Sequence, residues 1–210
     1  MWHYQTVHHD IWNFDNPTAP VLLDVVVDGR PTPIAVQTTK QGFAYTLNRE
    51  TGRPVWPIPE RPVAASDLPG EKLSPTQPHP TRPKPLEIQE LTEDVLIDFT
   101  PELRAEAIEI RKRYKTGPLF TPPSEKGTVV LPGWVGGANW GGAAFDPESG
   151  RLFVPSMTSP IVVQLVRPDG EKSNFQLLRG GQMNAPTIDG LPLTRPPYGR
   201  VTALDLHQGT

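Results

Sequence analysis

Short apolar clusters separated by Gly, Pro, Asn and Asp run along the whole chain and predict a mostly β protein. Each cluster is rich in Val, Ile, Leu or Phe and is bounded by residues that favour turns. Strands are predicted at residues 21–27, 34–38, 43–47, 128–131 and 161–166. The first is expected to be a buried strand. Asp28-Gly29 predicts a tight turn after it, so the second strand should pair back on the first.

One segment has the helical period instead and predicts a helix around residues 100–114. Thr100 is a favourable N-cap, and Pro101 follows it in the first turn, where proline is tolerated. Apolar side chains share one face at Leu103, Ala107, Ile110 and Tyr114. Glu109 and Arg113 are four residues apart and are expected to form an ion pair. The helix therefore has a structural explanation and is assigned no chemistry.

A turn pattern occurs three times, at residues 47–53, 145–151 and 204–209. Each copy has an apolar residue followed by Asn or Asp, and a Gly four residues after that. An Asx side chain that opens a turn and a left-handed Gly are typical of a tight hairpin with a bulge. Repeated hairpins predict a β-propeller or a related β repeat. Met1 leads straight into strand-like residues, and the third copy stops at Thr210 where a strand is expected. We therefore expect a fragment that is truncated at both ends.

Proline is unusually frequent, with 27 prolines and 18 glycines among 210 residues, as is typical of a loop-rich protein. Residues 57–90 are especially proline-dense and are expected to form an ordered excursion. Together with the helix they make a proline-rich and helical insertion over residues 57–118. The formal net charge of −3 gives no electrostatic basis for binding nucleic acid. The absence of cysteine excludes disulfides and thiolate zinc sites.

Polar and aromatic side chains are densest at residues 8–15, which contain two histidines, two aspartates, an asparagine and two large rings. This density suits a site that holds a planar ligand and moves protons, and it is equally explained by a polar strand edge with structural aromatics. If the segment is extended, Asn13 and Asp15 share one face and Asp10 lies on the other. Asp15 has a second explanation, because it precedes Asn16-Pro17 and such residues open turns.

Two other segments carry candidate chemistry. In residues 136–142, glycines let the backbone approach a flat ligand, Trp140 offers a stacking surface, and Asn139 offers a donor and an acceptor. A purely structural glycine turn explains the same residues. Lys40 lies between two predicted strands, where an exposed turn lysine is the ordinary explanation. The chain has no P-loop, nucleophile elbow, HExxH or dinucleotide motif.

Five segments together resemble the quinoprotein dehydrogenases, which use pyrroloquinoline quinone (PQQ), and the branch that contains membrane-bound glucose dehydrogenase is the most similar. The segments are residues 2–12 (WHYQTVHHDIW), 39–42 (TKQG), 119–124 (LFTPPS), 139–142 (NWGG) and 196–200 (PPYGR). They span nearly the whole chain in the family's order. The resemblance implies an all-β fold, part of an eight-bladed β-propeller with PQQ and usually Ca²⁺ at its axis. The repeated turn resembles the tryptophan-docking motif of these blades, with Trp56 as the docking residue of the first copy.

The resemblance also implies roles for individual residues. Lys40 occupies the position of a cation that faces the quinone oxygens, and Asn139 and Trp140 match a segment that lines the cofactor. The family's catalytic aspartate corresponds to Asn13, and an amide cannot take the hydroxyl proton that accompanies hydride transfer. The base is then Asp15 or Asp10, with parity slightly favouring Asp15; otherwise the ion and Lys40 suffice with water, or activity is weakened. The resemblance further implies that the Asn13 amide oxygen lies near Ca²⁺.

The resemblance leads to an enzyme hypothesis and an alternative. The chain is expected to be a fragment of a dehydrogenase that oxidises a sugar or alcohol hydroxyl by hydride transfer to PQQ. A membrane quinone or a cytochrome would accept the electrons. The resemblance implies a periplasmic location, and any inner-membrane attachment would use parts outside this chain. The fragment alone is expected to be inactive, since a partial ring exposes sheet faces. The alternative is a non-catalytic propeller scaffold that has lost its base, for which Asn13 is the argument.

Overall fold

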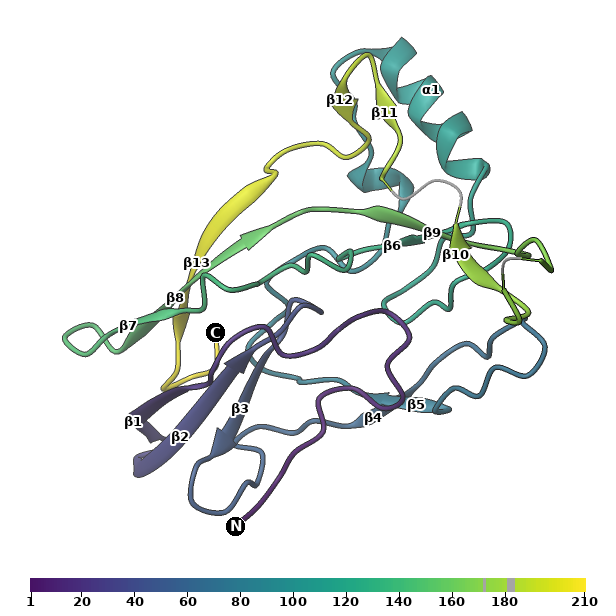
Figure 1. Ribbon diagram of the computed structural model, residues 1–210. Helices are drawn as coiled ribbons and strands as arrows, with labels where there is room; N and C mark the ends of the chain where they lie inside the picture. The colour runs from purple at the N-terminus through teal and green to yellow at the C-terminus, as the bar shows by residue number, and fades with distance from the viewer. Residues whose placement is uncertain (172, 181–183) are drawn as a thin grey trace.

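The structure is a computed structural model that describes residues 1–171, 173–180 and 184–210 (Figure 1). Within these residues, β-strands make up most of the regular structure, with one α-helix, α1 (Pro101–Lys112), and a short 3₁₀ helix, η1 (Glu93–Val95). The strands are β1 (Val21–Val27), β2 (Arg30–Thr38), β3 (Ala44–Asn48), β4 (Glu60–Pro62), β5 (Thr76–Pro78), β6 (Thr128–Val130), β7 (Ala144–Asp146), β8 (Arg151–Met157), β9 (Ile161–Val166), β10 (Leu178–Gly180), β11 (Thr187–Ile188), β12 (Leu191–Pro192) and β13 (Gly199–Asp205). The predicted all-β class with one helix is confirmed.

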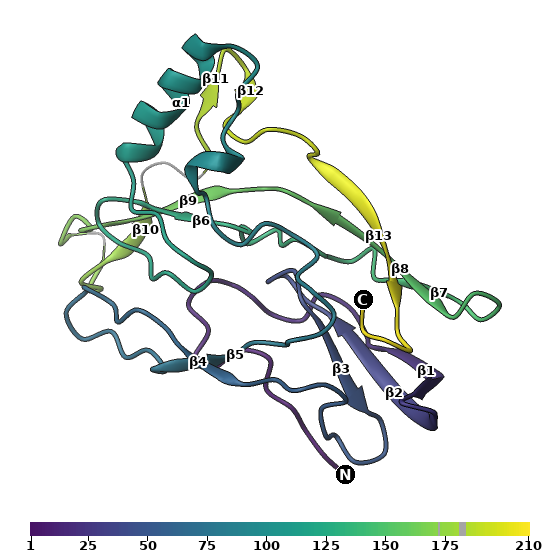
Figure 2. The same ribbon diagram turned by 180° about the vertical axis from the view of Figure 1, so that it is seen from behind.

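Three three-stranded antiparallel sheets form the body of the molecule, in the orders β1-β2-β3, β13-β8-β7 and β10-β9-β6. Two short hairpins, β4-β5 and β11-β12, accompany them. Within the described residues the sheets do not close into a ring. Figure 2 shows α1 and the β11-β12 hairpin together at one end of the molecule, far from β1-β2-β3.

The β1-β2 hairpin follows its sequence pattern closely. Asp28 and Gly29 both have positive φ, 49° and 73°, as a two-residue hairpin turn requires. However, β1 is buried on one face only. Leu23, Val25 and Val27 pack into the core, whereas Leu22 and Val26, on the opposite face, are 62% and 45% exposed. The prediction of a buried strand was therefore wrong for the outer face, because β1 is an edge strand with one face open to solvent.

The repeated turn is confirmed in all three copies. Gly52, Gly150 and Gly209 have φ of 71°, 68° and 71°, in the left-handed region that favours glycine. In each copy the Gly N–H donates to the carbonyl oxygen of the Asx residue four positions earlier, at 2.8 to 2.9 Å. The same local chemistry therefore closes the hairpin after β3, between β7 and β8, and after β13.

Trp56 joins the first sheet to the turn of the third copy. Its ring is 8% exposed, and a Cβ atom placed on Gly209 would lie 2.9 Å from it. The backbone just before Trp56 stays with the first sheet, because the Val55 N–H donates to the Thr46 carbonyl at 3.0 Å. Only a glycine allows the indole to approach this closely, so the docking role implied for Trp56 agrees with its packing.

The helix begins as predicted, with the Thr100 side chain accepting a hydrogen bond from the Leu103 N–H at 3.2 Å. The expected apolar face packs against the core, with Ala107 and Ile110 buried. The ion-pair prediction was wrong. Glu109 pairs with Lys112 at 2.7 Å, because the helix ends at Lys112 and the expected partner is its C-cap. Among the described residues, no helix is long and apolar enough to cross a membrane.

The proline-dense residues 57–90 are ordered by pairing and by packing on the first sheet. They contain β4 and β5, and then run alongside the turn between β2 and β3. There the Leu86 N–H donates to the Gly42 carbonyl at 2.7 Å, and the Gln89 side chain donates to the Gln41 carbonyl at 2.9 Å. The excursion therefore braces the turn that carries Lys40.

Three clusters of buried apolar side chains form the core. One joins the sheets β1-β2-β3 and β13-β8-β7, and a second lies beneath α1. The third supports the irregular N-terminal residues 1–20 and contains Trp12, Phe14, Phe43, Tyr45, Leu119, Phe120, Val130 and Ile161. The N-terminal segment and its candidate functional residues therefore pack on a cluster of buried, mostly aromatic side chains.

Candidate functional site

Residues 8–15 form a bent loop, so the premise of an extended strand was wrong. His9 and Asn13 have φ of 46° and 65°, which breaks the alternation of faces. Asp10 accounts for the bend, because its two carboxylate oxygens accept hydrogen bonds from the Trp12 N–H at 2.9 Å and the Phe14 N–H at 2.6 Å. Asp10 therefore has a structural role, and its oxygens are already engaged.

The aromatic residues on either side of Asn13 anchor the loop. Trp12 is 3% exposed, Phe14 is fully buried, and their rings stack with centroids 6.2 Å apart. The Trp12 indole N–H donates to the Thr121 carbonyl at 2.9 Å. With both neighbours held inward, Asn13 is exposed, and its side-chain amide has no hydrogen bond within the described part of the chain.

Further back, the loop is tied to the proline-dense excursion. His8 Nε2 lies 2.9 Å from the Glu60 carboxylate, and the His8 N–H donates to the Gln77 side chain at 2.8 Å. Burial raises the pKa of Glu60, but hydrogen bonds from His8 and Thr76, together with the charges of His8 and His79, lower the pKa overall. His8 therefore serves as an anchor in this structure.

Lys40 is the most deeply enclosed cation near the loop. Its side chain is 9% exposed, and its ammonium donates to Asp15 at 2.5 Å and to the Asn13 carbonyl at 3.2 Å. The explanation as an exposed turn lysine is therefore wrong, and the Asp15 carboxylate is engaged with Lys40. The structure brings together three of the predicted site residues, Asn13, Asp15 and Lys40.

The glycine-rich segment covers Lys40. A Cβ atom on Gly136 would lie 2.6 Å from Lys40 Cγ, and the Gly137 N–H donates to the Lys40 carbonyl at 2.8 Å. The glycines thus permit close approach to Lys40. Asn139 uses its amide locally, donating to the Val135 carbonyl and accepting from the Trp140 N–H at 2.8 Å. The Trp140 ring is 85% exposed, so it presents a flat surface to solvent.

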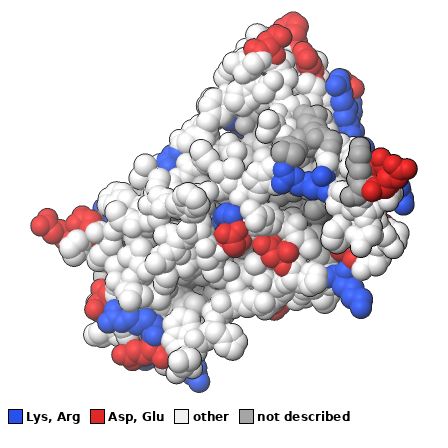
Figure 3. Space-filling model, in the orientation of Figure 1, with Lys and Arg blue, Asp and Glu red and all other residues white. Residues whose placement is uncertain are grey.

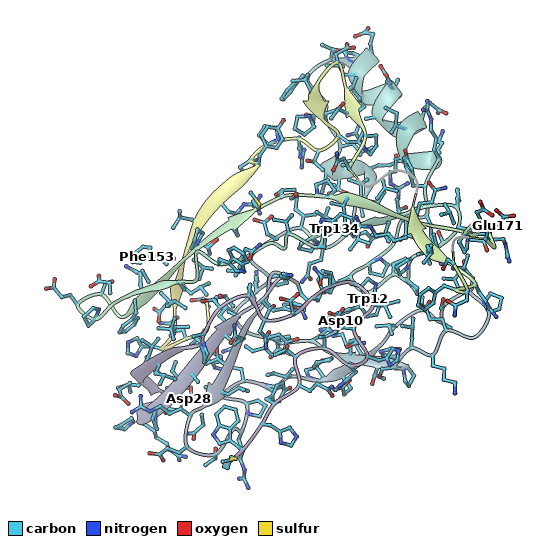
Figure 4. The ribbon with its side chains drawn as sticks, in the orientation of Figure 1. Asp10, Trp12, Asp28, Trp134, Phe153 and Glu171 are labelled. Carbon is cyan, nitrogen blue, oxygen red and sulfur yellow. The ribbon has the colours of Figure 1, made fainter. Side chains whose placement is uncertain are left out.

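A cavity of about 490 Å³ lies beside Asn13. Its lining residues are Ile11, Trp12, Asn13, Trp134, Val163 and Arg179. The Arg179 guanidinium carbon lies 3.9 Å from the centroid of the Trp134 ring. Figure 4 shows Trp134 on the loop after β6 and Trp12 on the N-terminal segment, near the centre of the molecule. Larger hollows lie elsewhere, but this one includes a predicted site residue.

Sequence reasoning missed a buried ion pair behind the Lys40 turn. Glu87 is fully buried and accepts hydrogen bonds from Ser156 at 2.7 Å, Thr158 at 2.8 Å and Arg200 at 2.6 Å. A Cβ atom on Gly137 would lie 2.8 Å from Glu87 Cγ, so this carboxylate supports the covering segment directly. Arg200 belongs to a recognised motif, but its partner is 113 residues away and no local pattern indicates the pairing.

The site has features that fit a quinone with acidic substituents. A nearly buried ammonium at Lys40 suits a quinone or carboxylate oxygen. By contrast, the part of the chain that the structure describes holds no group of three or more His, Asp or Glu side chains able to bind a metal ion.

Antiparallel sheets, a repeated Asx-to-Gly turn and Trp56 packed on one of those turns are typical of a β-propeller protein. The chain belongs to the family of PQQ-dependent dehydrogenases. A sequence model of the family, described as the β-propeller domain of glucose, ethanol and alcohol dehydrogenases, matches residues 1–210. The predicted family and propeller class are confirmed.

Individual relatives agree with this assignment. The chain is 32% identical to quinate/shikimate dehydrogenase (quinone) of Acinetobacter baylyi, with 98% of this chain and 28% of that protein covered. It is 34% identical to quinoprotein glucose dehydrogenase of Escherichia coli, again with 98% and 28% covered. The chain thus spans little more than a quarter of the length of these relatives. Quinohemoprotein alcohol dehydrogenase from Comamonas testosteroni has a similar fold, with a TM-score of 0.52 at 18% identity over 99% of this chain and 25% of that one.

Proposed function

We propose that this chain supplies substrate-facing and quinone-facing residues to a longer PQQ-dependent dehydrogenase that oxidises a hydroxyl group. The enclosed Lys40 ammonium beside the Asn13 loop is the observation that carries the proposal. The relatives' names indicate glucose and quinate or shikimate as substrates of those proteins, so a polyol, sugar or alcohol is the proposed substrate class. The proposed location is the periplasm, with a membrane quinone or a cytochrome as the electron acceptor.

PQQ, when bound, would supply a quinone able to accept a hydride from the alcohol carbon, and a base of the protein would take the hydroxyl proton as the alcohol becomes a carbonyl. In this chain Lys40 would hold a quinone oxygen and stabilise the charge that develops there. Asn139 and Trp140 are proposed to line the cofactor, and the exposed Trp140 ring supports a stacking role. The proposed mechanism assigns no step to Ca²⁺.

Asp15 is the proposed base, and the hydrogen bonds of the two nearby carboxylates, Asp10 and Asp15, support this choice. Asp10 has both oxygens on backbone N–H groups, so proton transfer to it would disrupt the loop. Asp15 is 59% exposed, holds one oxygen on Lys40, and keeps the other without a hydrogen bond in the described residues. The Asn13 amide then orients the substrate hydroxyl, as donor or acceptor.

The test uses the gene product at its full encoded length, supplied with PQQ and Ca²⁺ and assayed by dye reduction with aldoses, alcohols and cyclic polyols. PQQ-dependent turnover is expected, and Asp15→Asn should lower kcat by about 10²- to 10⁴-fold. Asp24→Asn is the matched control, because Asp24 pairs with Arg49 at 2.9 Å on the surface. Absence of turnover with every substrate, together with absence of bound PQQ, would refute the proposal.

The second candidate is a non-catalytic propeller scaffold, and Asn13 at the family's base position favours it. Asn13→Asp discriminates the two. An enzyme that already uses Asp15 turns over before the substitution and changes its rate and pH profile afterwards. A scaffold that lost its base is inactive with Asn13 and gains activity only with Asp.

A further inference from the structure

We propose that Trp134 determines substrate specificity, because its indole forms the wall that limits the size of a substrate in the cavity beside Asn13. This inference rests on the proposed function and specifies which hydroxyl compounds the site accepts. The cavity, of about 490 Å³, lies within the usual range of ligand pockets, about 300–1,000 Å³. A substrate that fills it would have a hydroxyl group next to the Asn13 amide.

Trp134 is the large side chain that presents surface to this cavity. The two indoles of the lining differ in exposure, because Trp12 is 3% exposed whereas Trp134 is half-buried. Ile11 and Val163 extend the apolar lining. Figure 3 shows acidic and basic side chains gathered at separate places on the face seen in Figure 1, with uncharged surface between them. An apolar wall discriminates between substrates by the volume and shape of the group placed against it.

Contacts from separate segments hold the Trp134 indole in place. Trp134 lies in a turn that is closed by a hydrogen bond from the Gly136 N–H to the Gly133 carbonyl at 2.8 Å. The Gly133 N–H in turn donates to the Ser159 carbonyl at 2.9 Å. On β10, Arg179 places its guanidinium carbon 3.9 Å from the centroid of the indole. The ring also packs against the aromatic cluster beneath the N-terminal segment. A wall that is fixed before the substrate arrives excludes a bulky substrate, whereas a mobile side chain would move aside.

The same turn connects this wall to the Lys40 site. A Cβ atom on Gly136, two residues after Trp134, would lie 2.6 Å from Lys40 Cγ. Asn13 also lines the cavity, and its carbonyl accepts a hydrogen bond from the Lys40 ammonium at 3.2 Å. A group in contact with Trp134 would therefore lie near the proposed base, Asp15, which pairs with Lys40. A change in the size of the wall should thus change which substrates react and leave the chemistry in place.

The experiment measures kcat/KM of the full-length, PQQ-loaded protein for pairs of substrates that share the reacting hydroxyl and differ in bulk: glucose with maltose, and cyclohexanol with isopropylcyclohexanol. The native protein should favour the smaller member of each pair. Trp134→Ala should raise the bulky-to-small ratio of kcat/KM by about 10- to 100-fold, mainly through KM. Trp134→Phe keeps most of the packing and should shift the ratio in the same direction by less, so it tests the inference if the alanine variant does not fold. Phe153→Ala is the control and should leave the ratio unchanged, because Phe153 is a 37% exposed ring on β8 that lies away from Trp134 in Figure 4.

A binding readout separates this inference from the chemistry of the loaded enzyme. Cyclohexanol should change the tryptophan fluorescence of the native apoprotein, and Trp134→Ala should bind isopropylcyclohexanol about 10-fold more tightly relative to cyclohexanol than the native protein does. An unchanged bulky-to-small ratio in both Trp134 variants overturns the inference, as does absence of cyclohexanol binding to the native protein; PQQ-dependent turnover would then leave the proposed function intact. A loss of PQQ loading in both variants also overturns it, because Trp134 would then belong to the cofactor site. Absence of any PQQ-dependent oxidation, with the binding ratio still changed, would instead overturn the proposed function and leave Trp134 as a size-limiting wall.

Discussion

The ion pair between Glu87 and Arg200 should be a major support of the Lys40 site, and its removal should be costly. Glu87 is fully buried and accepts three hydrogen bonds, one of them from the guanidinium. Glu87→Gln keeps the shape but loses the charge and turns an N–H₂ group toward a donor. Hydrogen bonds to charged groups contribute about 1.5–3 kcal/mol each, so we expect a loss of about 3 kcal/mol in the free energy of unfolding.

Replacing Arg200 should lower the free energy of unfolding more than replacing Glu87. The Arg200 side chain is 24% exposed and also donates to the Pro197 carbonyl at 3.0 Å, so it keeps other partners when the carboxylate is neutralised. Glu87 has no such exposure. Arg200→Gln leaves an uncompensated buried charge and should therefore cost more, about 4–5 kcal/mol. The double variant should cost less than the sum, with a coupling energy of about 1–3 kcal/mol.

Urea unfolding of the native protein, the two single variants and the double variant measures these energies as a double-mutant cycle. Hydrogen exchange adds a local readout, because the Gly137 N–H donates to the Lys40 carbonyl and a Cβ atom on Gly137 would lie 2.8 Å from Glu87 Cγ. Protection of that N–H should fall in both single variants. Losses below about 0.5 kcal/mol, or strictly additive losses, would refute the reasoning.

Two further outcomes concern packing and pH. Gly136→Ala should lower the free energy of unfolding by about 2–4 kcal/mol, because φ is +90° and the new Cβ would lie 2.6 Å from Lys40. Gly70→Ala is the control, because Gly70 has a similar φ of +83° but open space around it, and it should cost only about 1 kcal/mol. Equal losses in urea unfolding would contradict this account. Burial lowers the pKa of His79 below its ordinary value of 6.5, so the unfolded chain binds the extra proton, and stability should fall as pH drops from 7 through 6.5 towards 5. His79→Gln should flatten this pH dependence relative to the native protein, and an unchanged slope would count against it.

The elements that were predictable from sequence depend on local chemistry. Asp28 and Gly29 both adopt left-handed backbone conformations and so form their own hairpin turn. Thr100 caps the helix by accepting a hydrogen bond from the N–H of Leu103, only three residues later. Gly52 likewise adopts the left-handed conformation that closes its own turn. In each case the residues that determine the conformation lie within a few positions of one another, so the pattern contains the needed information.

The geometry of the site depends on contacts between distant segments. Residues 8–15 have the aromatic content of a strand, yet the two hydrogen bonds to Asp10 bend them into a loop. Lys40 is buried because Gly136 lies against it, and neither residue indicates this alone. The Glu87–Arg200 pair joins residues 113 positions apart. The roles of Asn13 and Lys40 came from the family resemblance, whereas the Lys40–Asp15 pair emerged only from the folded chain.

The central claim is that Lys40 faces the quinone of a working dehydrogenase, and Lys40→Met tests it most directly. In the full-length protein, PQQ-dependent dye reduction should fall by about 10²- to 10³-fold in this variant, as expected when a charge-stabilising group is lost. Lys112→Met is the control, because Lys112 also pairs with a carboxylate, at 2.7 Å, but is exposed on α1. The account predicts that the control keeps native activity. Native PQQ-dependent turnover in Lys40→Met would contradict the claim.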